Sequence, residues 1–419
     1  MKKGLGTKAM RLGCALALFA ACAGGMWAQS AKTTTIHIYQ TKIEIDKALK
    51  EVAEIYKRQH PNVDFVIDSV SDNYTTGLKT KFAGGQAPDI FVVLGGSDLE
   101  LWQSNLADLS DQAWAKDMDD LARTGITGKD GKVYGMPVSI EGYGYAYNKA
   151  LFEKAGVKTT PKTLSELKAA VAKLKAAGIQ PMTGAYMDWY QAGMFMVNMG
   201  IARQPDPEAF IAALNDGKAS FVGNKIFKEV AEFIQYDFSN CASPMNTGFN
   251  QQTSAFIGEK VAITLNGNWL QPSIDSTNPK MRPGLMPMPI DDDAKANDML
   301  YAGVTGYWSV NKDSPAKEES EKFLSWLTTT KEGRACFTDK LLFIPAFKSF
   351  SANAKVIGAL NTDLSDYLKQ GKVYGIYNSR YPSGGAELFG QAVQKLVAGK
   401  LDVDGFLQEL QDRWTQLKN

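Results

Sequence analysis

The segment after residue 33 alternates between short apolar strands and amphipathic helices. Strands are predicted at 35–39 (TIHIY), 64–70 (DFVIDSV) and 89–94 (DIFVVL), with helices at 42–59 and 73–83 between them. A strand–helix–strand order predicts a mostly parallel sheet covered by helices. Strands that are apolar throughout predict that both faces of that sheet are covered. The fold class is therefore expected to be α/β.

Later segments repeat this style over the rest of the 419 residues. Thr163 and Glu166 have the spacing of a helix N-terminal capping pair, and Gly178 ends that helix. Neither a repeat of fixed period nor a Pro- or Ser-rich linker divides the chain. This continuity predicts two lobes between which the chain crosses more than once. The other predicted elements are a strand at 261–265 and helices at 224–236, 315–330 and 387–417, the last broken near Gly399.

The first residues have the composition of an export signal. Residues 1–11 are basic, residues 12–21 are apolar, and small residues follow. The apolar run is shorter than the ~20 residues that a spanning helix needs, so a cleaved signal peptide is expected. Two cleavage sites remain open. Residues 1–28 leave as a leader, or residues 1–21 leave and Cys22 becomes the lipidated first residue of a lipoprotein.

Charge and rare residues exclude several classes of function. The leader holds four basic residues and no acid, so the remaining chain has 42 basic and 45 acidic residues. This balance argues against nucleic-acid binding. The two histidines, His37 and His60, are too few for most histidine-based metal or Ser-His-Asp sites, and both are expected to be structural. Cys241 and Cys336 remain in an oxidising compartment, and their pairing stays open.

Glycine and acidic motifs point to loops without a cofactor. None of the glycine pairs stands in a phosphate-binding motif, so nucleotide binding is not expected. The run at 291–293 lacks the later glycine and glutamate of a calcium loop, and no metal site is expected. Gly95-Gly96 follows a predicted parallel strand, where ligands of open α/β sheets bind. The loops at 94–98 and 40–42 are therefore candidates for contact with a ligand.

Aromatic residues gather at the ends of predicted elements. Tyr143, Tyr145 and Tyr147 alternate along one strand face. Other aromatic residues lie beside amides, carboxylates or glycines, which core packing does not require. An aromatic face with polar acceptors suits a sugar, whose C–H face stacks while its hydroxyls need hydrogen bonds. These sites are Asp188-Trp189, Asn266 to Trp269, and Tyr307-Trp308 after Gly303 and Gly306.

Four groups of motifs then resemble a known family. Residues 141–156 (EGYGYAYNKALFEKAG) and 161–167 (PKTLSEL) look like the signature of extracellular carbohydrate-binding proteins of ABC importers. The APDI start of a strand at 87–90, the segment 255–269 (AFIGEKVAITLNGNW) and the helix at 323–327 resemble further family motifs in the same order. The resemblance spans nearly the whole exported chain and is closest to the maltose-binding-protein-like group.

The resemblance implies a type II periplasmic-binding-protein fold with two α/β lobes, each a mostly parallel sheet with covering helices, and a hinge of three crossing segments. The first lobe would comprise residues 33–140 and 306–347, and the second residues 141–305 and 348–419. A sugar would bind in the cleft between them. No enzymatic chemistry and no cofactor are implied.

The resemblance also implies roles for particular residues. Glu141 occupies the place of a hinge carboxylate that contacts sugar, and Trp269 matches a stacking tryptophan. Trp189 is the nearest match to a second stacking aromatic. The loop after the third strand departs from the maltose-binding pattern, so maltose is not predicted. With the candidates from the residues themselves, the expected ligand-binding set is Gln40, Gly96, Ser97, Asp98, Glu141, Tyr143, Asp188, Trp189, Asn266, Asn268, Trp269, Tyr307 and Arg380.

The expected function is capture of a mono- or oligosaccharide and its delivery to the permease of an ABC transporter. The protein is expected to be an exported monomer, in the periplasm or on the outer face of the cytoplasmic membrane, free or held by a lipid anchor. Three alternatives stay open. The same fold could bind a phosphodiester, polyamine or metal ion. The protein could be a sensor that presents sugar to a receptor instead of a permease, or it could be a glycoside hydrolase that uses Glu141 and Asp188.

Overall fold

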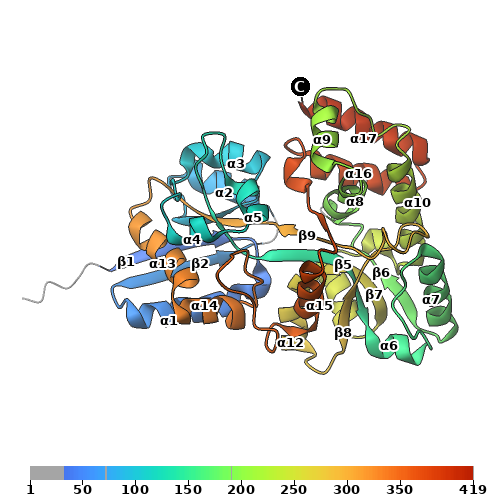
Figure 1. The fold of residues 1–419 in the computed structure, drawn as a ribbon, viewed down its shortest axis with the longest axis horizontal. Coiled ribbons are helices and arrows are strands. Elements are labelled where there is room, and N and C mark those ends of the chain that lie inside the picture. Colours follow the sequence, from blue (N-terminus) through green and yellow to red (C-terminus); the bar gives the residue numbers. More distant parts are fainter. Residues whose placement is uncertain (1–32, 71–72, 190, 419) are drawn as a thin grey trace, which may run out of the picture.

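The computed structural model describes residues 33–70, 73–189 and 191–418. The predicted leader and Cys22 lie outside these residues. Figure 1 shows two bodies, each with its own sheet and helices, and strand β5 (Ile140–Asn148) runs between them. Two large apolar cores correspond to these bodies, and a smaller third core lies near the hinge.

The first sheet contains the predicted strand–helix–strand segment. Strand β1 pairs parallel with β2 and β3, whereas β10 is antiparallel to both β3 and β4. Residues 307–310 return to this sheet after the second lobe and enter it from the opposite direction. The strand order is β2 (Val63–Ser69), β1 (Thr34–Gln40), β3 (Ile90–Val93), β10 (Tyr307–Val310) and β4 (Met136–Pro137).

The longer helices of the first lobe bury apolar side chains in its core. In α1 the predicted face is buried, with Leu49, Val52 and Tyr56 at 0% exposure. The predicted helix at 42–59 starts as a 3-10 turn over Ile43–Ile45. The helices are α1 (Asp46–Gln59), α2 (Tyr74–Ala83), α3 (Ser97–Trp102), α4 (Ala113–Asp117), α5 (Asp120–Ile126), α13 (Lys317–Thr329) and α14 (Lys331–Ala335).

The second sheet differs from the expected mostly parallel arrangement. Strand β5 is antiparallel to β7, β8 and β9, and the parallel pairs are β6 with β7 and β11 with β9. The expectation was wrong here because β5 enters from the hinge and its neighbours run back toward it. The path is β11 (Val373–Gly375), β9 (Leu300–Val304), β5, β7 (Val261–Gly267) and β6 (Gln180–Thr183), with β8 (Pro283–Met286) also beside β5.

Helices cover both faces of the second sheet. The Thr163 side chain caps α7 by accepting a hydrogen bond from the Glu166 N–H at 3.1 Å, as predicted. Gly399, with φ of 68°, lies in the predicted break before the last helix. The helices are α6 (Lys149–Lys154), α7 (Leu164–Ala176), α8 (Val197–Ala202), α9 (Pro207–Asn215), α10 (Lys225–Asn240), α11 (Phe249–Ile257), α12 (Gln271–Thr277), α15 (Gly358–Lys369), α16 (Gly385–Val397) and α17 (Val403–Lys418).

Within residues 33–418 the chain crosses between the two sheets three times. The first two crossings join β4 to β5 and β9 to β10. The third lies later than the expected change at 347/348. The Lys348 N–H donates to the Asp117 carbonyl at 2.8 Å, and the Phe350 ring packs 5.8 Å from that of Phe337. The chain therefore stays with the first lobe as far as Phe350, before it enters α15.

The two cysteines of the described chain are free thiols. Cys336 is buried in the first core, and Cys241 packs against the second. Their placement in different lobes excludes the disulfide that the sequence left open. No helix among the described residues is long and apolar enough to span a bilayer.

Candidate functional site

Charged side chains meet where the first lobe approaches the hinge strand. Lys42 follows β1 and forms an ion pair with Glu141 near the start of β5. The Lys42 ammonium is also 3.2 Å from the carboxylate of Glu44. The Thr305 hydroxyl, between β9 and β10, donates a hydrogen bond to Glu141. These four residues are called the hinge cluster, and they join the first lobe to two of the crossings.

The hinge cluster is shielded from solvent. The side chains of Lys42, Glu44 and Glu141 are 15%, 17% and 9% exposed. Burial alone would lower the pKa of the Lys42 ammonium, but the charges of Glu141 and Glu44 outweigh burial and raise that pKa above its ordinary value. Burial raises the pKa of the Glu44 carboxyl. A carboxylate offers about four acceptor positions, so Glu141 retains capacity for a ligand hydroxyl beyond its two partners.

An aromatic surface lies on the same face of the second sheet as Glu141. Alternate residues of a strand share a face, so Glu141 and Tyr143 project together. The ring of Phe195 lies 4.5 Å from that of Tyr143, and the half-buried ring of Trp269 lies 5.5 Å from that of Phe195. The Trp269 ring also covers Gly267, where an added Cβ would overlap it. The structure thus brings Glu141 and Trp269 to one surface.

Phe195 was not predicted for the site. It lies in a π-helical turn over Gln191–Met196, directly before α8. Such turns are rare and are frequent at functional sites. The sequence offered no signal for it, because the mostly apolar pattern at 191–202 is typical of a buried helix.

The segment after β11 completes this surface. A Cβ on Gly303, which pairs with Glu141 in register, would lie 3.3 Å from the Cβ of Ile376. Ile376 is therefore placed on the same face as Glu141. The N–H of the half-buried Tyr377 donates to the Asn198 side chain at 2.7 Å. Tyr377 too was missed, since nothing in the sequence links residues 376–377 to the hinge strand.

Asp188 and Trp189 follow β6 in the second lobe. The Asp188 carboxylate accepts a hydrogen bond from the Phe249 N–H at 2.6 Å. Trp189 is 44% exposed, and its backbone packs tightly against Gly390 of α16. This exposure places part of the indole at the surface of the second lobe.

The first lobe supplies the opposite side of the interlobe region, which we call the first wall, and the aromatic surface of the second lobe is the second wall. The two walls differ in composition. The loop after β3 holds Gly95 and Gly96, with φ of 82° and 54°, and Ser97 begins α3. The half-buried Asp98 carboxylate accepts a hydrogen bond from the Leu94 N–H at 2.8 Å and so holds the loop to the end of its strand. Burial raises the pKa of Asp98. This wall offers backbone and small polar groups instead of rings.

Two predicted tyrosines lie in the cores. Tyr143 is 0% exposed, and its hydroxyl donates to the Phe195 carbonyl at 3.0 Å. Tyr307 is 2% exposed, and its hydroxyl donates to the Ala122 carbonyl at 2.8 Å. The alternation that predicted an exposed aromatic face marks a buried one, and we do not retain either tyrosine in the site.

Three predicted amides are engaged within the protein. Gln40 is fully buried and accepts a hydrogen bond from the Lys42 N–H at 2.7 Å. Asn268 accepts from the Gly142 N–H at 2.9 Å and so ties β7 to the hinge strand. Asn266 is 2% exposed and accepts from the neighbouring N–H of Gly267. These side chains support the site and do not line it.

Arg380 lies at the outer edge of the cleft. Its guanidinium is 3.5 Å from the Glu208 carboxylate within the second lobe. Both residues line a groove of about 1070 Å³ that runs between the lobes and also touches Gly96 and Ser97. Neither Glu141 nor the two tryptophans lie on it. The groove and the aromatic surface are thus separate parts of the interlobe region.

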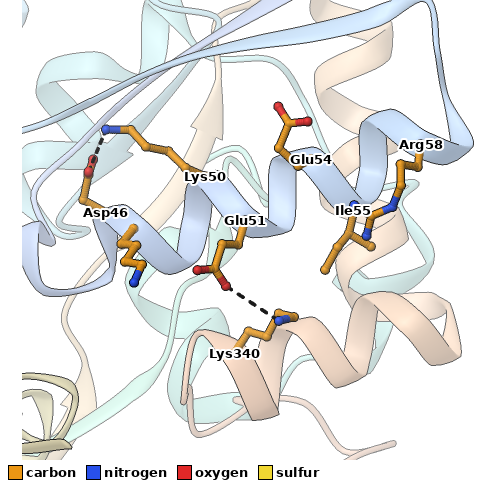
Figure 2. Close-up of a pocket in the computed structure, with 8 residues that line it drawn as sticks. Asp46, Lys50, Glu51, Glu54, Ile55, Arg58 and Lys340 are labelled. Carbon is orange, nitrogen blue, oxygen red and sulfur yellow. Dashed lines mark hydrogen bonds and ion pairs between the residues drawn. The ribbon is translucent and has the colours of Figure 1, made fainter. Parts of the chain in front are cut away.

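A second hollow lies far from these residues, on the outside of the first lobe. Figure 2 shows it along α1, where Glu51 is 3.7 Å from Lys340 and Asp46 is 2.7 Å from Lys50. Its volume is about 570 Å³, and its lining is charged apart from Ile55. It lacks rings on which a sugar could stack. The described residues also contain no group of three histidine, cysteine or acidic side chains placed to hold a metal ion.

Comparison with known proteins identifies the family of the chain. The family model for bacterial extracellular solute-binding proteins matches residues 40–334. A multiple sugar-binding protein of Streptococcus mutans is 25% identical over 327 residues, which cover 75% of this chain and 76% of the relative. The melibiose/raffinose/stachyose-binding protein MelE of Bacillus subtilis is 21% identical over 399 residues and covers 92% and 90%.

A solved structure shares the fold. The solute-binding protein RafE in complex with raffinose superposes with a TM-score of 0.77 at 19% identity, covering 92% of this chain and 100% of that one. The predicted two-lobed fold is thereby confirmed.

Proposed function

Because the chain belongs to the family of bacterial extracellular solute-binding proteins, we propose that it binds a sugar between its lobes and delivers it to an ABC-type membrane permease. One observation carries the proposal. The Trp269–Phe195 surface and the shielded Glu141 carboxylate lie on the same face of β5, at the crossing between the lobes. A ring for the C–H face of a pyranose and an acceptor for its hydroxyls are the two elements that sugar recognition needs.

The proposed cycle is capture by hinge closure. The second lobe offers aromatic area, and the loop after β3 approaches from the first lobe. A ligand shifts the equilibrium toward the closed form only by its greater affinity for that form, so both walls must contribute contacts. No covalent bond is made or broken. The proposed contact residues are Glu141, Trp269, Trp189, Asp188, Ser97 and Asp98 from the sequence, together with Tyr377 and Lys42 from the structure. Phe195 is only 8% exposed, and its role is to pack against the Trp269 ring.

The names of the relatives guide the choice of sugar. The similar proteins are named for melibiose, raffinose, stachyose or multiple sugars. We therefore propose a short oligosaccharide as the ligand. A phosphodiester is less well served, because a phosphate favours an Arg fork and Arg380 already faces Glu208.

We also propose that the lobes comprise residues 33–140 with 306–350 and 141–305 with 351–419, and that the protein acts as an exported monomer. The predicted leader allows a free form and a form anchored through Cys22. Labelling with radioactive palmitate in a bacterial host distinguishes them, because label that disappears in Cys22→Ala identifies the lipoprotein.

Isothermal titration tests the main proposal. Melibiose, raffinose, stachyose and maltotriose form the panel, and spermidine and glycerophosphocholine represent the rival solutes. We expect binding of at least one sugar and neither rival. Binding of a rival solute alone would transfer the assignment away from sugars, and release of nitrophenol from aryl glycosides would identify an enzyme.

A further inference from the structure

The loop after β3 reaches the second lobe through its backbone. Gly96 and Ser97 lie against Ser379, which belongs to a 3-10 turn over Asn378–Arg380 that follows β11. The Ser97 hydroxyl donates to the Ser379 carbonyl at 3.5 Å. This contact, here called the rim contact, joins the lobes on the side of the cleft away from the hinge cluster.

The rim contact leaves no space for a side chain. A Cβ added to Gly96 would overlap the Ser379 carbonyl and lie 3.2 Å from the Ser379 Cβ. The glycine loop cannot move back into the first lobe, because it already packs closely against that lobe. A Cβ on Gly95 would be 2.6 Å from the Gly125 carbonyl oxygen, and Gly125 packs against the buried Tyr307. Any side chain at position 96 must therefore push Ser379, and the second lobe with it, outward.

We infer that Gly96 is a positioning residue that sets how closely the two lobes approach. Its missing side chain lets the first lobe advance until backbone meets backbone at Ser379. The inference rests on the proposed function, since closeness of the lobes matters when a ligand is held between them. A side chain at 96 acts as a wedge and reduces the population of the closed form.

The fraction of closed protein determines the apparent affinity for a ligand. The apparent dissociation constant rises in inverse proportion to the competent fraction, so a wedge that lowers the closed fraction about tenfold weakens binding about tenfold. The same wedge can be built from the other side of the contact. A phenylalanine replacing Ser379 meets Gly96 without changing the backbone of the glycine loop.

A crosslinking experiment tests the inference without a ligand. Ser97→Cys and Ser379→Cys are placed in a mature chain that carries Cys241→Ser, and disulfide formation under copper phenanthroline is followed on non-reducing gels. Adding Gly96→Ala should slow the crosslink about tenfold, as the closed fraction falls. Gly131→Ala is the control, because Gly131 also has positive φ, 77°, but a Cβ there meets nothing within 4 Å. Equal rates in the two variants would overturn the inference.

Sugar titration then separates the two hypotheses. In titrations of raffinose and the rest of the panel, Ser379→Phe should weaken binding about tenfold, with an unchanged melting temperature. The control is Ser254→Phe, on an exposed position of α11. If the wild-type chain binds no sugar but Gly96→Ala still slows the crosslink, the closure role stands and the sugar proposal falls. If the wild-type chain binds sugar, Ser379→Phe leaves its affinity unchanged and Gly96→Ala leaves the crosslinking rate unchanged, Gly96 has no positioning role.

Discussion

The two walls of the interlobe region are built from opposite materials. The second lobe presents rings, with Trp269 against Phe195 and Trp189 at 44% exposure. The first lobe presents the Gly95-Gly96 backbone and the small side chain of Ser97. Rings supply apolar area that gains free energy when a ligand covers it, whereas glycines permit close approach. The difference indicates that one wall provides affinity and the other provides fit.

The first wall contains Lys42 of the hinge cluster. Loss of its charge should have the largest effect on stability among these predictions. Lys42→Met leaves the shielded carboxylates of Glu141 and Glu44 without their cation. Breaking such a pair costs about 3 kcal/mol of unfolding free energy, measurable by urea denaturation at pH 7. The deficit should shrink as pH falls, because the pKa of Glu44 is raised by burial and its protonation removes one uncompensated charge.

Lys50→Met is the matched control for Lys42→Met. Lys50 pairs with Asp46 at 2.7 Å, but its side chain is 56% exposed, and exposed pairs contribute about 0–1 kcal/mol. Equal losses in the two lysine variants would show that the hinge cluster has no special part in joining the walls.

Trp269→Ala tests the second wall and has the next largest effect. Loss of a partly buried ring should weaken sugar binding by about 1–3 kcal/mol in titration, while Trp269→Phe should retain part of the affinity. Phe350→Ala serves as control, because this ring packs on the first core away from the cleft. It should lower the melting temperature and leave affinity unchanged. An unaltered affinity in Trp269→Ala would remove that ring from the site.

The comparison also shows what the sequence could supply. Local patterns predicted β1, β2, β3 and β7 as well as α1 and the capped α7, because period and capping chemistry act over a few residues. Antiparallel pairing in the second sheet escaped prediction, since it depends on how distant segments return through the hinge. Four motifs together identified Glu141 and Trp269, which the structure places on one surface.

Whether the remaining aromatic residues face a ligand or the core could not be predicted from the sequence. Tyr143 stands between Gly142 and Gly144, and its ring is covered by Phe195 and Tyr301. Nothing in its own strand distinguishes a ring that faces a ligand from one that faces a helix. Phe195 and Tyr377 joined the site for the converse reason, because long-range packing brings their segments to the hinge strand.

The loop of the first wall should respond to pH through Asp98. Burial raises the pKa of this carboxyl, so the folded chain binds its proton more tightly than the unfolded chain does. Stability from this group therefore falls as pH rises above the ordinary Asp value of about 3.9. Asp98→Asn should remove that decline, whose slope is at most about 1.4 kcal/mol per pH unit for one proton. Urea denaturation between pH 4 and pH 7 measures it.

Asp46→Asn is the control for Asp98→Asn, because it should change the slope of unfolding free energy against pH in the opposite direction. Burial alone would raise the pKa of Asp46, but hydrogen bonds from Lys50 and Ser69 outweigh burial and lower it. Its stabilisation is present above the ordinary Asp value and is lost as pH falls. If both variants change the pH slope in the same direction, Asp98 does not hold the loop in the way that the structure indicates.

Ser97→Ala should have the smallest effect on sugar affinity. It tests whether the first wall contributes to affinity at all. The hydroxyl makes a 3.5 Å bond to Ser379 across the rim contact, and a bond of that length at a half-exposed position contributes at the low end of about 0.5–1.5 kcal/mol. Sugar affinity should therefore fall less than in Trp269→Ala, and thermal unfolding should stay within error. Ser104→Ala, on an exposed serine of the same lobe, controls for loss of a hydroxyl. If Ser97→Ala weakened binding as much as Trp269→Ala, the first wall would supply affinity as well as fit, and the division of roles would fail.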